Sequence, residues 1–128
     1  MHASDIQPAS GLFLHDEPWL VLEVRQQTGD GSPGIALILL NVLTGGKWAA
    51  RWAPGETVGS SFTFERMRAT LDSVDGFIHR FWDAVGHKMY ELPADQVFTE
   101  VAQDDDRIFE LLHYEGNVVG AAVPEPGR

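Results

Sequence analysis

The sequence contains no cysteine, which excludes disulfide bonds, thiolate metal ligands and a cysteine nucleophile. It also lacks a long apolar run. The longest, Ile35 to Leu40, is far shorter than the ~20 residues that a membrane-spanning helix needs. The start of the chain lacks the basic segment followed by an apolar segment that marks a secretory signal. We therefore expect a cytoplasmic protein without a membrane partner.

Basic side chains are scarce as well. Nine Lys and Arg stand against 19 Asp and Glu, so the formal net charge of the 128 residues is −10. Proteins that capture nucleic acid by charge neutralise its phosphates with Lys and Arg. The overall charge therefore disfavours DNA as a partner. It leaves room for a nucleic acid recognised through its shape or through a local basic patch.

Glycine and proline divide the first half of the chain into short segments of strand character. No stretch up to Ser61 has the periodicity of a helix. The strongest turn, Thr28 to Gly34, holds three glycines and a proline and predicts an exposed hairpin tip. Met1 to Ser10 are small and polar, and we expect them to be frayed. The segments predicted to form strands are Gly11 to Val24 as a pair around a turn, Ile35 to Val42, and Lys47 to Trp52.

The strand Ile35 to Val42 is apolar at nearly every position, which indicates burial on both faces or contact with another domain. Gly59 to Ser61 looks like a domain junction. Beyond it, Asp75-Gly76 is a strong hairpin signal, and Pro93 to Val101 favours a short helix. Five strands with one short helix match an OB-type barrel. These strands are predicted at Phe64 to Ser73, Phe77 to Trp82, His87 to Leu92, Ile108 to Tyr114, and Val118 to Val123.

Several motifs stand in an order that resembles a known family. They are Gly11-Leu12 through Trp19, Gly29 to Gly31, Asn41 to Gly45, Arg66-Met67, Val74 to Gly76, Tyr90 to Leu92, and Tyr114 to Gly116. Together they resemble the first two domains of bacterial elongation factor P and the two-domain initiation factor 5A. The resemblance implies an all-β fold, with an SH3-like (KOW-type) barrel over residues 1–61 and an OB-fold barrel over residues 62–128. It also implies a non-enzymatic translation protein that binds the ribosome and peptidyl-tRNA and relieves stalling at proline runs.

The resemblance places the family's functional residue at the tip of the first hairpin. That family carries a Lys or Arg there, often enlarged by modification, and the matching position in this sequence is Asp30. The surrounding tip residues are Gly29, Gly31, Ser32 and Pro33. Aspartate cannot take an amine-forming modification, and its charge would repel RNA. The tip is therefore predicted to be acidic and unmodifiable.

Two interpretations of Asp30 stay open. It is either a functional tip that differs from the family or an ordinary turn residue, because Asp between glycines is common in hairpins. No Lys or Arg lies between Arg25 and Lys47, so a shift of the alignment restores no cation. Arg25, Lys47 and Arg51 are the nearest cations, and we expect any RNA contacts from them.

Other clusters carry weaker hypotheses. His79, Asp83 and His87 are four residues apart, as metal ligands on a helix would be, but this segment has strand and turn character. The acidic run Asp104 to Asp106 lacks the spacing of a calcium loop, which favours a solvated turn. No nucleophile elbow and no phosphate-binding loop is present. The sequence therefore predicts no metal site, no cofactor and no enzymatic activity.

Aromatic residues offer two further hypotheses. Phe77, Phe81, Trp82 and Tyr90 could stack nucleic-acid bases, but no basic groove surrounds them, so core packing is favoured. Trp48 and Trp52 fall on one face of a strand and suggest a domain interface. The alternative to the translation role is a non-enzymatic protein-binding module that kept the fold but lost that role. Such a module would hold its partner through the acidic surface or through the apolar strand Ile35 to Val42.

Overall fold

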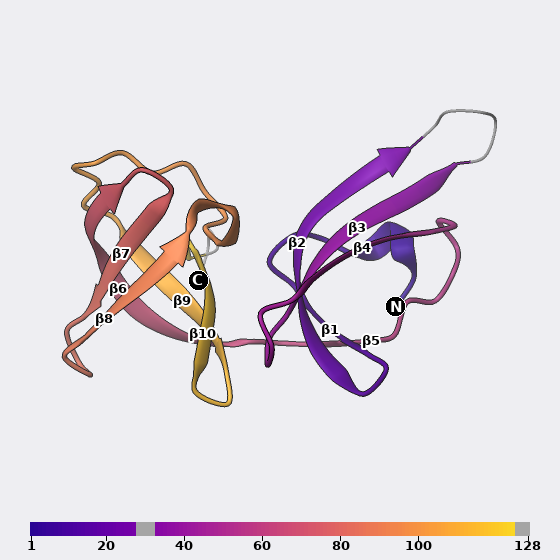
Figure 1. The fold of residues 1–128 in the computed structure, drawn as a ribbon, viewed down its shortest axis with the longest axis horizontal. Coiled ribbons are helices and arrows are strands. Elements are labelled where there is room, and N and C mark those ends of the chain that lie inside the picture. Colours follow the sequence, from indigo (N-terminus) through magenta and orange to yellow (C-terminus); the bar gives the residue numbers. More distant parts are fainter. Residues whose placement is uncertain (28–32, 125–128) are drawn as a thin grey trace. The chain divides into compact units, whose positions relative to one another are not determined.

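The computed structural model describes residues 1–27 and 33–124. The chain divides into two compact units, Met1–Phe64 (unit 1) and Glu65–Arg128 (unit 2). Each unit contains one five-stranded sheet, and the strands within each sheet pair in antiparallel fashion (Figure 1). The prediction of an all-β fold is confirmed. Within the described residues, no helix has the length and apolar character required to cross a membrane.

Unit 1 is a meander whose last strand returns beside the first. The order across the sheet is β4-β3-β2-β1-β5, which is the strand order of an SH3-like barrel. β4 and β5 are consequently the two edges of the sheet. The strands are β1 (Gly11–Leu14), β2 (Glu17–Gln27), β3 (Gly34–Asn41), β4 (Lys47–Trp52) and β5 (Ser60–Phe62).

The core of unit 1 follows the two-residue period of its strands. Ile35, Leu37 and Leu39 of β3 are buried in one cluster with residues of β1 and β2, whereas Ala36 and Ile38 between them are half-buried on the opposite face. Full burial of each aliphatic side chain contributes about 1.5–3 kcal/mol. β3 therefore anchors the sheet with one face, whereas its other face is only half-buried at Ala36 and Ile38.

The prediction that Met1 to Ser10 are frayed is wrong. Residues Ala3–Asp5 form the short 3-10 helix η1, and Ala3 and Ile6 are buried in the core cluster. The amide of Ala3 donates to the carbonyl of Glu56 at 2.9 Å. A unit of this size has little apolar surface to bury, so it uses the apolar side chains of its N-terminal segment.

The segment Gly59 to Ser61 leads directly into a strand. Ser60–Phe62 forms β5, which pairs with β1. Gly59 has φ +56, and an added Cβ there would collide with the carbonyl oxygen of Phe13, so this position requires glycine. The division into an SH3-like domain of residues 1–61 and an OB-fold domain of residues 62–128 stays a prediction.

Unit 2 has the strand order β10-β9-β6-β7-β8. Numbered within the unit, this is fifth-fourth-first-second-third, the order of an OB-fold barrel. Its core contains Phe81, Phe109 and Leu111, and the Phe81 and Phe109 rings meet edge to face at 5.3 Å. The strands are β6 (Glu65–Asp75), β7 (Ile78–Asp83), β8 (Lys88–Pro93), β9 (Ile108–Tyr114) and β10 (Asn117–Ala122).

The helix predicted over Pro93 to Val101 is wrong beyond a single turn. Only Ala94–Gln96 are helical, as the 3-10 helix η3. Directly after it, the amide of Phe98 donates to the carbonyl of Ala121 in β10 at 2.8 Å. This hydrogen bond to β10 holds the backbone in an extended form where local propensity alone would have continued the helix.

Core packing is confirmed for two of the four aromatic residues named above. Phe81 is fully buried, and Tyr90 packs against the same cluster. It is wrong for Phe77, which is 83% exposed because β7 begins one residue later, at Ile78. Trp82 is half-buried and opposite Met89.

Candidate functional site

The predicted hairpin tip is described only in part. Gly29, Asp30, Gly31 and Ser32 lie outside the described residues, and Pro33 is exposed just before β3. The role of Asp30 therefore stays a prediction. Of the three cations predicted to contact RNA, Arg25 lies on β2, which leads to the tip, and Lys47 and Arg51 lie on β4, which pairs with β3.

The strand register places these cations on one face of the sheet. Arg25 of β2 is opposite Ala36 of β3, and Ala36 is opposite Arg51 of β4. Directly opposed residues share a face, and neighbouring strands lie about 4.8 Å apart, so the two arginine backbones are separated by roughly 10 Å. Lys47 is opposite Leu40 and, being four residues from Arg51, lies on this face too. We call this side of the sheet, opposite the core, the cationic face.

A β-bulge in β2 puts Arg25 on the cationic face. Val21 is opposite Leu39, but the next pair joins Glu23 to Ile38, so Leu22 is an extra residue. A bulge of one residue exchanges the two faces of every later position on its strand. Without it Arg25 would point into the core. With it, Val24 takes the core position, where it packs against the buried cluster.

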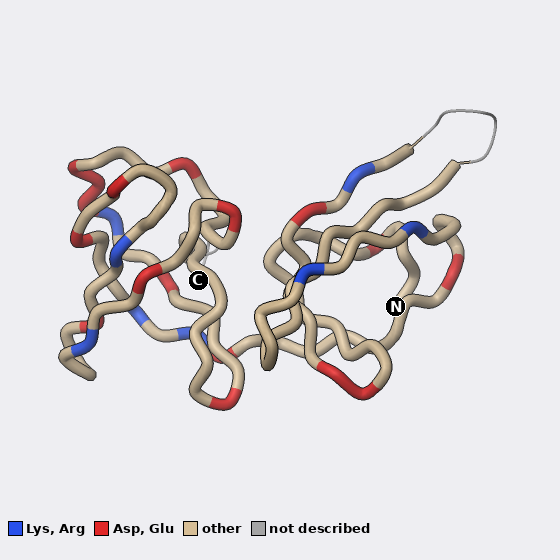
Figure 2. Tube along the Cα trace, in the orientation of Figure 1, with Lys and Arg blue, Asp and Glu red and all other residues tan. Residues whose placement is uncertain are grey.

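Local contacts shape the cationic face. The guanidinium of Arg25 forms an ion pair with Glu23, with 2.7 Å between Nε and Oε1. Both side chains are well exposed, so this pair contributes little to stability. Arg51 lies across Gly34, where an added Cβ would collide with its guanidinium. Figure 2 shows basic residues of unit 1 on β2 and β4, with acidic residues concentrated at its turns and on β2.

The opposite face of β4 carries a tryptophan cluster. Trp48 and Trp52 lie edge to face at 5.8 Å, and Trp48 lies 5.7 Å from Trp19 of β2. The prediction that Trp48 and Trp52 share a face is confirmed, and their role in a domain interface stays a prediction. The indole Nε1 of Trp19 donates to the carbonyl of Leu14 at 3.3 Å. Trp48 remains 37% exposed.

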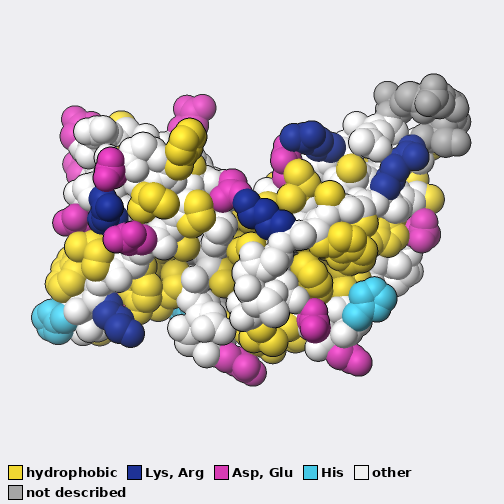
Figure 3. All heavy atoms as spheres, in the orientation of Figure 1, with side chains coloured by type: hydrophobic (Ala, Val, Ile, Leu, Met, Phe, Trp, Pro, Cys, Tyr) yellow, Lys and Arg dark blue, Asp and Glu magenta, His cyan; other side chains and the backbone are white. Residues whose placement is uncertain are grey.

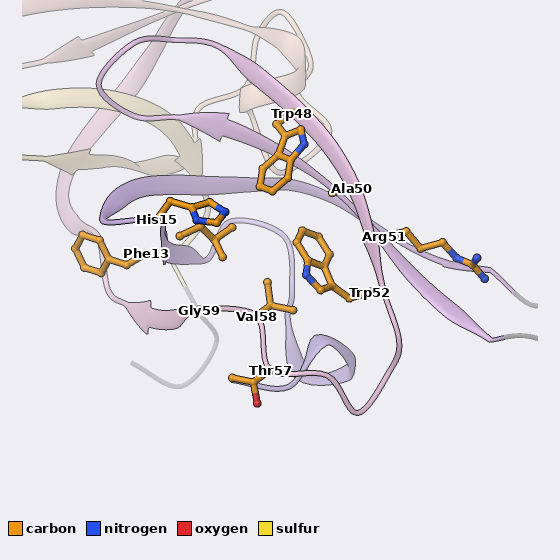
Figure 4. A pocket seen from close by; sticks show the side chains of 10 residues that line it. Phe13, His15, Trp48, Ala50, Arg51, Trp52, Thr57, Val58 and Gly59 are labelled. Atoms are coloured by element: carbon orange, nitrogen blue, oxygen red, sulfur yellow. The ribbon is translucent and has the colours of Figure 1, made fainter.

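A pocket of about 470 Å³ opens beside this cluster. On one side Trp48 and Trp52 flank the small residue Ala50, and on the other lie the β1–β2 turn with His15 and the segment 57–59. Figure 4 shows both indoles turned toward His15 and Val58, whereas the side chain of Arg51 points away. Sequence reasoning missed this pocket. The alternation of large and small residues along β4 was the signal that could have revealed it.

The residues considered as metal ligands do not converge. His79 is buried in β7 with an Nδ1 that has no hydrogen-bond partner, and Asp83 accepts from the amide of Val85 at 3.0 Å. His87 is exposed, with its ring 6.1 Å from that of Trp82. In the part of the chain that the structure describes, no group of three His, Cys, Asp or Glu could hold a metal ion.

The acidic run in unit 2 contains an internal ion pair. Arg107 donates from its Nη2 to Asp105 at 2.7 Å and also to the carbonyl of Glu100 at 2.7 Å. The hydrogen bond from Arg107 lowers the pKa of Asp105 to about 2 and raises the pKa of the guanidinium. Asp105 therefore acts as a turn residue with a fixed partner.

Together, the two strand orders define a two-barrel β-protein, SH3-like and then OB-like. No protein-family model and no curated protein matches the sequence.

Two of the solved structures that are similar to this chain are translation initiation factors. Eukaryotic translation initiation factor 5A from Methanococcus jannaschii is 9% identical, with 94% of this chain and 88% of that chain covered and a TM-score of 0.44. A translation initiation factor eIF-5A family protein from Naegleria fowleri is 13% identical, with 98% and 94% covered and the same TM-score of 0.44. The fold assignment rests on the strand orders rather than on these similarities.

Proposed function

We propose that this protein is an elongation factor P-like translation protein that binds the ribosome and peptidyl-tRNA through the hairpin of unit 1. The observation that carries the proposal is the cationic face, where Arg25, Lys47 and Arg51 share one side of the hairpin sheet. The order of the motifs along the whole sequence supports it. In this role the protein is cytoplasmic and non-enzymatic, and Asp30 takes the sequence position of the family's modified Lys or Arg.

The cationic face reconciles RNA binding with a net charge of −10. A bound RNA interacts most strongly with the nearest charges of the protein, because exposed charges more than about 8–10 Å away are screened at physiological salt. Each phosphate neutralised contributes about −0.7 to −0.9 to the slope of log K against log salt. Contacts from three cations therefore give a slope of roughly −2 to −3.

Ribosome co-sedimentation tests this proposal. The protein should pellet with ribosomes at low salt and dissociate as salt rises. The double change Arg25→Ala and Arg51→Ala should weaken binding. It should also reduce the slope of log K against log salt by the contribution of about two phosphate contacts. Arg68→Ala, an exposed arginine of unit 2, serves as the control. Absence of any association at low salt would contradict the proposal.

A second experiment addresses the tip. The chain is expressed in cells that lack elongation factor P, and translation through a proline run is measured with the wild type and with Asp30→Lys. Rescue by both shows that an acidic tip functions. Rescue by the variant alone favours the alternative, a protein-binding module that kept the scaffold and lost the translation role. The net charge of −10 is the observation that supports this alternative.

A further inference from the structure

β4 is an open edge of the unit 1 sheet. Among the described residues it pairs with β3 and with no other strand. In an antiparallel sheet, alternate residues of an edge strand direct their N–H and C=O groups away from their partner. About half of the six residues Lys47–Trp52 therefore present backbone groups to the outside. Such an edge is a template for another strand.

The segment that leads into the opposite edge strand, β5, is covered. His2 forms an antiparallel bridge with Thr57, and the amide of Val58 donates to the carbonyl of Met1 at 2.8 Å. The N-terminal ammonium group also donates to the carbonyl of Gly59 at 3.1 Å. The chain thus uses its own N-terminal residues to cover the segment before β5, whereas no strand within residues 1–27 and 33–124 pairs with the outer edge of β4.

The inner face of β4 determines which side chains an added strand would need on the side that faces the core. Trp48, Ala50 and Trp52 alternate large, small and large, and all three line the pocket of about 470 Å³. Side chains of paired strands that lie directly opposite each other are about 5 Å apart. An added residue opposite Ala50 would direct its side chain toward this pocket, beside the two indoles, whose rings contact each other at 5.8 Å. A bulky apolar side chain is the best match.

The outer face of β4 determines which side chains the added strand would need on its other side. Lys47 and Arg51 flank Ala49 there, and opposite charges across a strand pair are favourable whereas like charges are not. In Figure 3, hydrophobic side chains and neighbouring basic side chains both reach the surface over β3 and β4. The complement of β4 is therefore a strand whose outward residues are acidic.

We propose that β4 binds an extended segment of another protein in which bulky apolar residues alternate with acidic residues. The segment adds to the sheet as a strand beside β4. A second copy of this chain fits less well. Antiparallel pairing of β4 with itself would gather both copies of Lys47 and Arg51 on one face, and each copy carries a net charge of −10. The inference does not depend on ribosome binding.

The first test is peptide binding. The probe is the blocked peptide acetyl-Glu-Leu-Glu-Leu-Glu-Leu-Glu-amide, titrated by calorimetry and by tryptophan fluorescence. We expect saturable binding, at least about tenfold tighter than that of the same residues in the order Glu-Glu-Leu-Leu-Leu-Glu-Glu, because only strict alternation matches both faces. Equal affinity for the two peptides, or no binding at about millimolar concentration, would overturn the proposal.

A matched pair of variants locates the site. Ala50→Phe narrows the pocket beside the indoles and should weaken binding about tenfold or more, whereas Ala84→Phe, at an exposed position of unit 2, should change it less than about threefold. Ala50 points into a pocket, so we expect the variant to fold, which circular dichroism checks. Equal effects of the two changes would show that the pocket is not used.

Backbone pairing has its own test, which needs no variant. Two versions of the peptide are N-methylated on alternate residues, one at odd and one at even positions. A strand beside β4 tolerates methyl groups only on amides that point away, so one version should bind and the other should not. Equal binding of both would overturn strand addition. Concentration-dependent dimers that Ala50→Phe abolishes, without peptide binding, would assign the edge to a second copy.

Discussion

Ile6 lies in a segment whose composition suggests disorder, yet the structure buries it. Its side chain is 4% exposed and belongs to the cluster that includes Leu12 and Val21. Replacement of a buried isoleucine by alanine costs about 2–5 kcal/mol, because it removes apolar contacts and leaves a cavity. A domain of roughly 60 residues is only marginally stable. Ile6→Ala should therefore remove a large part of the stability of unit 1.

Urea and thermal unfolding followed by tryptophan fluorescence measure this effect. Three of the four tryptophans lie in unit 1, so the signal reports mainly on that unit. A loss of 2 kcal/mol corresponds to a fall of about 8–16 °C in the midpoint for a domain of this size. Gln7→Ala, at the exposed neighbouring position, is the control and should stay within about 0.5 kcal/mol of the wild type. An Ile6→Ala variant as stable as this control would refute the buried N-terminal segment.

Two further predictions concern a glycine and an ion pair. An alanine in the left-handed backbone conformation costs roughly 1–2 kcal/mol. Gly59→Ala should destabilise unit 1 by more than this, because the added Cβ would also collide with the carbonyl of Phe13. Gly45→Ala is the control, since its φ is +77 with open space around it, and equal losses in urea unfolding would exclude the collision. The pKa of Asp105 is lowered from 3.8 to about 2 by its hydrogen bond from Arg107, so this pair stabilises the fold above about pH 4 and loses its effect as the pH falls through about 2. Asp105→Asn should lower the thermal midpoint at about pH 6 and converge with the wild type near pH 2, and a difference that persists unchanged at low pH would contradict this origin.

Local patterns were sufficient to predict most strands. β4 begins and ends where alternation and turn residues place it, and β3 is displaced by one residue from its predicted bounds. The failures have tertiary causes. Ala3 is held by a hydrogen bond to Glu56, and Phe98 by one to Ala121, and neither partner can be inferred from neighbouring residues.

The candidate site, like the fold, could be predicted only in part from local sequence patterns. The sequence identified Arg25, Lys47 and Arg51 only as the nearest cations to the tip. Whether they share a face depends on the pairing of three strands and on the extra residue Leu22. The pocket beside Ala50 likewise needs segments far apart in the chain to come together. The sequence identifies such residues, but the register of the paired strands determines which of them share a face or line a pocket.

The bulge at Leu22 makes β2 two half-strands of opposite parity. In the first half odd-numbered residues such as Val21 face the core, and in the second half even-numbered residues such as Val24 do. The gain or loss of one residue here would exchange an arginine for a valine at the surface without altering the composition of the strand. Related hairpins should therefore be compared face by face, because numerical alignment through a bulge pairs surface positions with core positions.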